Sequence, residues 1–152
     1  MNRILTYTLL LIAVQQSLIT NSQNVGLVSD GAGLYMKDNP TLSVKGSSNS
    51  NLTISAAGTL EATGTIQLDG SFSNSGTVQM GNVNLSLKGN WTNDGTFAEA
   101  TSIVTFDGTV AQNIDHNNNA FYQLVINAGN ADTAILLSSF EVKNLLNFLN
   151  GA

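Results

Sequence analysis

Three aspartates, Asp69, Asp94 and Asp107, are the residues of this chain best suited by type to acid–base chemistry. Cleavage of a glycosidic bond needs two carboxyl groups that the fold holds a few ångströms apart. These aspartates fall at expected turns or outward positions in different contexts, so the sequence predicts no such pair. Lys88 follows Asp69 by nineteen positions (88 − 69 = 19), and we expect an exposed ion pair of little energetic weight between them.

His116 is the only histidine, and it lies beside Asp115 in the Asn-rich segment 115–119. A metal site or a nucleophile relay needs further ligands or a serine at a recognisable spacing, and the sequence offers neither. We therefore interpret His116 as a loop histidine. Because the chain has no cysteine, disulfide bonds and thiolate chemistry are excluded. The sequence predicts no catalytic, metal-binding or cofactor-binding residue, and we expect a protein that is not an enzyme and uses no cofactor.

The composition of the chain limits its partners and favours strands. Five Lys and Arg stand against ten Asp and Glu in 152 residues, which gives a net charge of −5 and argues against nucleic acid or an anionic membrane as partner. Only 10% of the residues are charged, and the polar remainder is rich in Asn, Ser, Thr and Gly. Such a mixture favours strands and turns over helices, and the length suits a single domain.

An internal repeat defines the elements that would position these residues. Residues 64–82 (GTIQLDGSFSNSGTVQMGN) align with residues 83–101 (VNLSLKGNWTNDGTFAEAT). The matched residues all share one parity, so they point to one face of an extended chain, which we take as the interior. An earlier copy, residues 52–60, aligns with residues 70–78 at an offset of eighteen (70 − 52 = 18), and residues 42–46 resemble residues 85–89. The matched pairs include Ile66 with Leu85, Leu68 with Leu87, Gly70 with Gly89, Phe72 with Trp91, Asn74 with Asn93, Gly76 with Gly95 and Val78 with Phe97.

Repeats of about twenty residues, with short alternating strands and Gly or Asn at the bends, are typical of a β-solenoid. We expect an all-β fold, a β-solenoid of the right-handed parallel β-helix type. Stacked coils would place Phe72 near Trp91, at roughly 4.8 Å per coil. The aromatic residues Phe72, Trp91 and Phe97 then belong to the core rather than to a sugar-stacking platform. An antiparallel sandwich with hairpins at the glycines is the competing architecture.

Asn74 and Asn93 have two interpretations. Their inward parity favours an internal ladder in which each side-chain amide bonds the next one. Their flanking glycines favour simple turn residues.

Beyond Thr101 the rhythm changes, but strand-like segments continue. Residues 104–108 and 121–127 read as strands on either side of the 115–119 loop, and residues 134–137 and 140–148 read as the last strands. Residues 145–149 also fit the start of a short helix, because apolar residues there occupy both parities. We favour the strand.

The N-terminus has the three-part layout of a secretory signal peptide. Arg3 precedes the apolar run 4–14, which is followed by the polar stretch 15–23. The run is shorter than the roughly 20 residues that a membrane span needs. We predict a signal peptide at residues 1–22, a β-solenoid region at residues 23–152, no membrane span, and a secreted or outer-surface location. A buried N-terminal helix is the alternative.

Several short motifs together resemble a known class of proteins. They are the leader, residues 29–37 (SDGAGLYMK), residues 89–97 (GNWTNDGTF), residues 104–108 (VTFDG) with 111–114 (AQNI), and residues 121–127 (FYQLVIN). The chain resembles exported repeat proteins of Bacteroidetes-type bacteria, whose β-helical coils are similar to those of filamentous-haemagglutinin-like adhesins. The resemblance implies a longer surface protein, often exported by type IX secretion. We interpret the chain as the N-terminal fragment of such a protein or as a truncated reading frame.

These observations lead to one expected function and one alternative. We expect a non-enzymatic, structural or adhesin-like segment of an exported cell-surface protein, with glycans or other cell-surface components as the class of partner. A solenoid that ends without a polar cap also invites edge-to-edge self-association. The alternative is a carbohydrate-binding or polysaccharide-cleaving β-helix whose site lies outside this fragment.

Overall fold

The computed structural model describes residues 26–46, 50–127 and 134–149, and all regular elements in these ranges are β-strands. The strands alternate inward apolar and outward polar residues, as expected for a half-buried sheet. In chain order they are β1 (Leu27–Ser29), β2 (Gly33–Met36), β3 (Thr41–Val44), β4 (Leu52–Ile54), β5 (Thr59–Leu68), β6 (Phe72–Asn74), β7 (Thr77–Leu87), β8 (Trp91–Asn93), β9 (Thr96–Ala98), β10 (Ile103–Phe106), β11 (Gln112–Asp115), β12 (Ala120–Ile126), β13 (Ala134–Leu136) and β14 (Glu141–Phe148).

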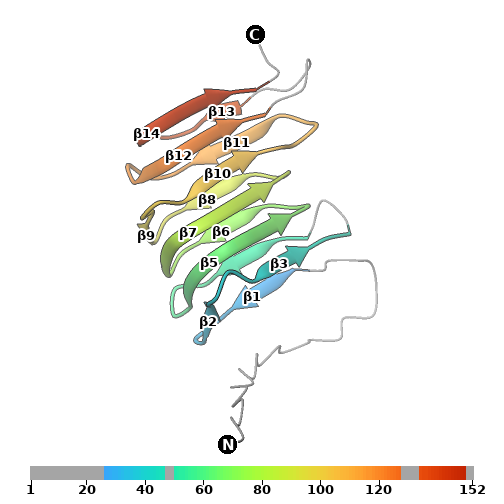
Figure 1. Cartoon of the computed structure of the whole chain (residues 1–152), viewed down its shortest axis with the longest axis vertical. Coiled ribbons are helices and arrows are strands. Elements are labelled where there is room, and N and C mark those ends of the chain that lie inside the picture. The colour runs from blue at the N-terminus through green and yellow to red at the C-terminus, as the bar shows by residue number, and fades with distance from the viewer. Residues whose placement is uncertain (1–25, 47–49, 128–133, 150–152) are drawn as a thin grey trace, which may run out of the picture.

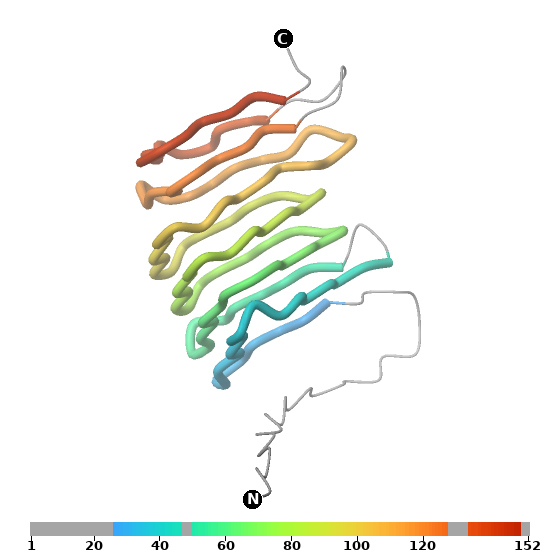
Figure 2. Tube along the Cα trace, viewed as in Figure 1, coloured from blue at the N-terminus to red at the C-terminus, as the bar shows by residue number. Residues whose placement is uncertain are grey.

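The strands form two parallel sheets that face each other and run along the whole stack (Figure 1). One sheet has the order β1-β4-β6-β8-β11-β13, and the other runs β14-β12-β10-β7-β5-β2, with β3 pairing with β5 and β9 pairing with β7. The chain passes from one sheet to the other in each circuit, so successive coils lie on one another (Figure 2). This arrangement confirms the predicted β-solenoid. The antiparallel sandwich is excluded, because every strand pair in the described ranges is parallel.

The register confirms the nineteen-residue alignment. Ile66 pairs with Leu85, Phe72 pairs with Trp91 and Val78 pairs with Phe97.

The offset of eighteen for the earlier copy is correct in one sheet and wrong in the other. Leu60 does pair with Val78, but Leu52 pairs with Phe72 rather than with Gly70 (72 − 52 = 20). The turn after β4 carries two extra exposed residues, Ala56 and Ala57, which absorb the difference. Since the shift is two residues, the inward parity of the strand is unchanged.

The space between the sheets is filled by apolar side chains stacked in columns. Leu52, Phe72, Trp91 and Ile114 form one such column, and all four are almost fully buried. The rings of Phe72 and Trp91 stack with centroids 4.2 Å apart, while Phe97 meets Trp91 edge-on at 5.5 Å. The three aromatic residues are therefore core residues, as predicted, and each contributes on the order of 2 kcal/mol through burial alone.

One corner of the coil brings successive backbones too close for any side chain. A Cβ atom on Gly95 would lie 2.3 Å from the carbonyl oxygen of Gly76, and one on Gly76 would lie 2.3 Å from that of Ser55. The repeated glycine of this turn is therefore required by the stacking of the coils.

The C-terminal strands are confirmed, and the helix alternative is wrong, because residues 145–148 belong to β14. The parallel pairing of β14 with β12 overrides the mixed parity of its apolar residues. The predicted signal peptide, residues 1–22, lies outside the described residues. In the part of the chain that the structure describes, no helix is long and apolar enough to cross a membrane.

Candidate functional site

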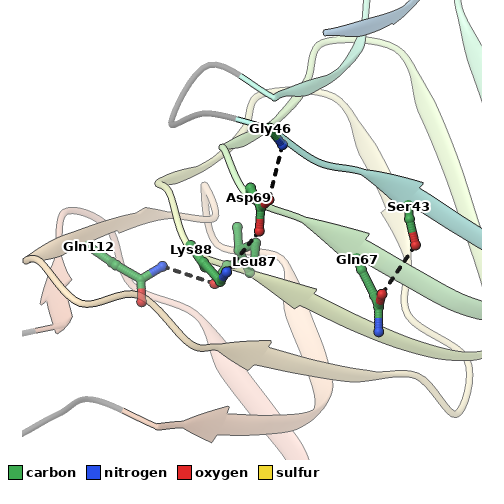
Figure 3. A network of polar contacts seen from close by, with 7 residues as sticks. All are labelled: Ser43, Gly46, Gln67, Asp69, Leu87, Lys88 and Gln112. Atoms are coloured by element: carbon green, nitrogen blue, oxygen red, sulfur yellow. Dashed lines mark hydrogen bonds and ion pairs between the residues drawn. The ribbon is translucent and has the colours of Figure 1, made fainter. Parts of the chain in front are cut away.

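Charged side chains form one column at the C-terminal ends of successive strands in the eight-stranded sheet. Lys45, Asp69, Lys88 and Asp107 each follow the last residue of a paired strand segment, so the stacking of coils places them one above another. Lys88 Nζ lies 2.8 Å from Asp69 Oδ1, and the backbone N–H of Gly46 donates to Asp69 Oδ2 at 3.1 Å (Figure 3). We call these four residues the charged column. Its positive and negative charges alternate along the axis of the solenoid.

The charged column corrects one expectation and confirms another. Asp69 and Asp107 do not lie in different contexts: they occupy the same column, two coils apart, because both follow a paired strand at the same register. Lys88 separates them and forms the expected exposed ion pair with Asp69. Asp94 is exposed and lies elsewhere, directly after β8.

The electrostatics of the charged column favour the ionised forms of Asp69 and Lys88. The hydrogen bond from Lys88, followed by the one from the Gly46 backbone, lowers the pKa of Asp69. The hydrogen bond to Asp69 raises the pKa of Lys88, and the charge of Asp107 adds to the effect. A general acid needs the opposite, a carboxyl pKa raised toward neutrality. The alternating charges of the column therefore compensate one another, and they do not create a carboxyl group suited to donate a proton.

Beside the charged column the outer sheet face is hollowed into a shallow depression. Gln67 and Ser86 line it together with Lys45, Asp69, Lys88 and Asp107. Ser43 Oγ donates to Gln67 Oε1 at 3.1 Å, so polar groups of neighbouring coils already bond one another here (Figure 3). The depression presents hydroxyl, amide and charged groups within one polar strip.

Gln112 is an inward polar residue that sequence reasoning missed. Its Nε2 donates to the carbonyl oxygen of Leu87 at 3.2 Å (Figure 3). Nε2 also donates to the carbonyl oxygen of Gly89 at 2.6 Å, and Oε1 accepts from the Gly108 backbone at 2.8 Å. Gln112 therefore supplies hydrogen-bond partners to backbone groups at and beside a corner of the coil. The available signal was its parity, which it shares with the inward residue Ile114.

Asn74 and Asn93 combine both expected roles in a fully buried position. Asn74 Nδ2 donates to Asn93 Oδ1 at 2.7 Å, which confirms the ladder, while Asn74 Oδ1 accepts from the Gly76 backbone at 3.0 Å, as a turn residue does. Asn74 Nδ2 also donates to the Thr96 carbonyl at 3.1 Å. Asn93 Nδ2, in contrast, has no hydrogen-bond partner among the described residues. The two asparagines are thus unequally satisfied.

His116 lies in a loop, as predicted, because it follows the last residue of β11 and begins the turn 116–119, but it is not an exposed loop residue. Its side chain is fully buried, and its ring stacks on Phe121 with centroids 3.9 Å apart. Trp91 Nε1 donates to His116 Nδ1 at 3.0 Å, which assigns the ring proton to Nε2, and Nε2 donates to the Ala120 carbonyl at 3.1 Å. Strand β11 explains the burial, because residues 112, 114 and 116 share one parity and all point inward.

The environment of His116 keeps it neutral. Burial lowers its pKa to about 4, against the Ala120 hydrogen bond and the charges of Glu99 and Asp115, which act to raise it. Both ring nitrogens have partners in the core, so this histidine is part of the packing rather than a relay to a nucleophile. Within residues 26–46, 50–127 and 134–149, no three His, Asp or Glu side chains gather in a way that could hold a metal ion.

Comparison of the chain with protein-family models, with curated proteins and with solved structures gives no match. What the structure shows is the architecture itself, a β-solenoid of parallel, repeated coils.

Proposed function

We propose that the chain is a non-enzymatic structural segment of an exported surface protein, an adhesin-like rod that presents its outward polar face. The observation that carries the proposal is that the two sides of each strand have different roles. Inward positions are used for packing, as in the column of Leu52, Phe72 and Trp91. Outward positions form polar columns along the axis, such as Ser43, Gln67, Ser86 and Thr105.

The titratable residues support the same proposal. Asp69 is held in an ion pair, Asp107 accepts a hydrogen bond from Asn127 Nδ2 at 2.7 Å, and His116 is closed inside the core. These groups stabilise coil-to-coil contacts along a rod. The leader predicted at residues 1–22 and the short motifs that resemble exported repeat proteins support a location outside the cell.

Export is tested by expressing the full chain in a bacterial host. We expect the protein to leave the cytoplasm with the leader removed before Gln23, as measured by the mass of the exported product. Leu10→Arg should block export, because a charge interrupts the apolar run of the leader. Val28→Arg places the same charge at an exposed position of β1 and serves as the matched control. Retention of the uncleaved wild-type chain in the cytoplasm contradicts the proposed location.

The alternative function is separated from the rod by a glycan-binding screen on the exported chain. A rod that carries no site of its own in this segment shows no saturable binding. Saturable binding that is abolished by Gln67→Ala and Ser86→Ala, in the depression beside the charged column, favours a carbohydrate-binding β-helix instead. Thr53→Ala, on the outward side of the other sheet, is the control.

A further inference from the structure

The outward side of the eight-stranded sheet forms a polar surface across four successive coils. The strands of these coils are β2 with β3, then β5, then β7, and then β9 with β10, and the long strands β5 and β7 lie in the middle. They lie toward the viewer in Figure 1. Their outward side chains are half-buried or exposed. We call the outward side of residues 33–45, 59–69, 77–88 and 96–107 the outer face.

The charged column of the outer face is complementary to itself when its direction is reversed. Along the axis it reads Lys45, Asp69, Lys88, Asp107. A second copy that runs in the opposite direction therefore brings its Asp107 opposite Lys45 and its Lys88 opposite Asp69. Sliding that copy by one coil in either direction places like charges opposite each other, which is unfavourable. The charges therefore select one antiparallel register.

A second outward column of the outer face is complementary in the same register. It reads Tyr35, Glu61, Gln79, Ala98. In the antiparallel register the large side chain of Tyr35, which is 41% exposed, lies opposite the small Ala98. Glu61 lies opposite Gln79, whose side-chain amide can donate to the carboxylate. Charge, size and hydrogen bonding thus agree on one alignment.

We propose that the outer face binds the outer face of a second copy of this chain, with the two solenoids antiparallel and the two-fold axis between β5 and β7. The same surface is used by both copies, so the contact is isologous and closes as a dimer. Two copies side by side in the same direction would place lysine opposite lysine. The inference goes beyond the proposed function and does not depend on export.

The size of the outer face suits a weak, reversible dimer. β5 has ten residues, and four coils lie about 4.8 Å apart, so the face covers roughly 600 Å² of each copy. A total of roughly 1,200 Å² is the lower end of specific protein interfaces. Exposed charge pairs add little to affinity, but they determine register and partner choice.

Charge exchange between two variants tests the alignment. Lys88→Asp and Asp69→Lys each place like charges opposite each other in a homodimer, and each should weaken self-association at least tenfold. In an equimolar mixture every new aspartate lies opposite a lysine of the other chain, so we expect a one-to-one heterodimer. Sedimentation equilibrium of the full chain and native mass spectrometry measure these states. Association of the wild type should also weaken at about 1 M salt.

Asp94→Lys is the matched control for Asp69→Lys. It makes the same change of charge at an exposed position directly after β8, in the other sheet, and should leave dimerisation unchanged. Circular dichroism checks that the variants keep the β-fold. A wild-type chain that stays monomeric up to about 1 mM overturns the proposal. A mixture of folded variants that forms no heterodimer overturns it as well.

A cross-linking test that leaves the charges in place determines the relative direction of the two copies. Ser43 and Thr105 begin and end one outward column, Ser43–Gln67–Ser86–Thr105. The proposed register places Ser43 of one copy opposite Thr105 of the other, across the roughly 10 Å between packed sheets. Because the chain has no cysteine, Ser43→Cys and Thr105→Cys each introduce a unique thiol.

We expect a thiol cross-linker of about 10 Å reach to join Ser43→Cys chains to Thr105→Cys chains in the mixture. Either variant alone should give at least tenfold less linked dimer, because its two thiols lie about three coils apart along the axis. Efficient linking of Ser43→Cys to itself overturns the antiparallel register. A mixture that stays unlinked at concentrations where the chain is dimeric overturns it too.

Discussion

Strands β12 and β14 are neighbours in one sheet, yet their equivalent residues have different surroundings. Leu124 in β12 and Leu146 in β14 are the same residue type in the same column, and they pair directly. Leu124 is 1% exposed, whereas Leu146 is 46% exposed. The difference lies in the neighbouring coils: Leu124 has a paired residue on both sides, Val104 and Leu146, while among the described strands Leu146 is paired with Leu124 alone.

The comparison shows that a residue of this solenoid is buried by its neighbours along the axis. In a globular domain, the sequence pattern of an element largely decides which side chains are buried. Here the alternation of residues along a strand determines which side chains point inward. The number of coils stacked beside a side chain determines how far it is buried. The energetic value of a side chain should therefore depend on its position in the stack.

The largest expected effect separates the two leucines. Leu124→Ala should lower the free energy of unfolding by about 2–5 kcal/mol, because it opens a cavity between two coils. Leu146→Ala removes contacts on one side only and should cost about 1 kcal/mol or less. Denaturant unfolding at low protein concentration measures both, so that self-association does not contribute. Equal losses would show that the end coil is covered in solution.

Acid should lower the stability of the fold through His116, which lies where the last coil packs against the preceding one. The backbone N–H of His116 donates to Ser138 Oγ at 2.8 Å, and its ring lies edge-on to Phe140, so it contacts the last coil directly. Since the pKa is lowered to about 4 in the folded chain, the unfolded chain binds more protons between the ordinary histidine pKa and pH 4. Stability is therefore complete at neutral pH and falls with pH through this window, by an amount on the order of 3 kcal/mol.

The variant His116→Gln isolates this contribution, because glutamine does not titrate. Wild type and variant are unfolded by denaturant at about pH 7 and at about pH 5, where most carboxyl groups are still ionised. The wild type should lose clearly more stability than the variant between the two values. Parallel losses in both would contradict the assignment of this acid response to His116.

The comparison of strands also explains what could be predicted from the sequence. Parity placed Phe72, Trp91 and Asn74 inside, because alternation along a strand is a local property. The asparagines after His116 correctly indicated a loop. The burial of its side chain was missed because it depends on β11 pairing with strands far away in sequence. Asp69 and Asp107 lie in one column because the coils between them have matching lengths. That match cannot be recognised from either segment alone.

The Asn74–Asn93 pair provides a matched test within the interior. Asn74→Leu removes the acceptor of the Gly76 N–H and the donor to Asn93 Oδ1, and should cost about 1–3 kcal/mol. Asn93→Leu removes an Nδ2 group that has no partner among the described residues, and Asn74 Nδ2 keeps the Thr96 carbonyl. We expect the second substitution to be within about 1 kcal/mol of neutral. Denaturant unfolding of both variants measures the difference, and an equal cost would contradict the asymmetry of the ladder.

The smallest expected effects distinguish an ion pair of the middle coils from one at the end. Lys88→Met should hardly move the unfolding midpoint at neutral pH, because its pair with Asp69 is open to water. Lys143→Met should act more strongly. It leaves the largely buried carboxyl group of Glu99 without its partner, and it removes a link between the last coil and the turn after β9.

The pH and salt responses of the two lysine variants follow from the same geometry. Burial raises the pKa of Glu99, but the hydrogen bonds from Lys143 and from the backbone, together with the charge of Lys143, outweigh it and leave the pKa lowered. The pair therefore stabilises the fold above the ordinary pKa of a glutamate and loses this effect as pH falls through the lowered value.

Midpoints measured at low salt and at about 1 M salt should converge for Lys88→Met and wild type, because salt screens exposed charges. They should stay apart for Lys143→Met, since the Glu99 carboxyl is shielded from solvent. If high salt removes the Lys143→Met difference as well, Glu99 is open to water and the end coil is more loosely packed than the contact implies.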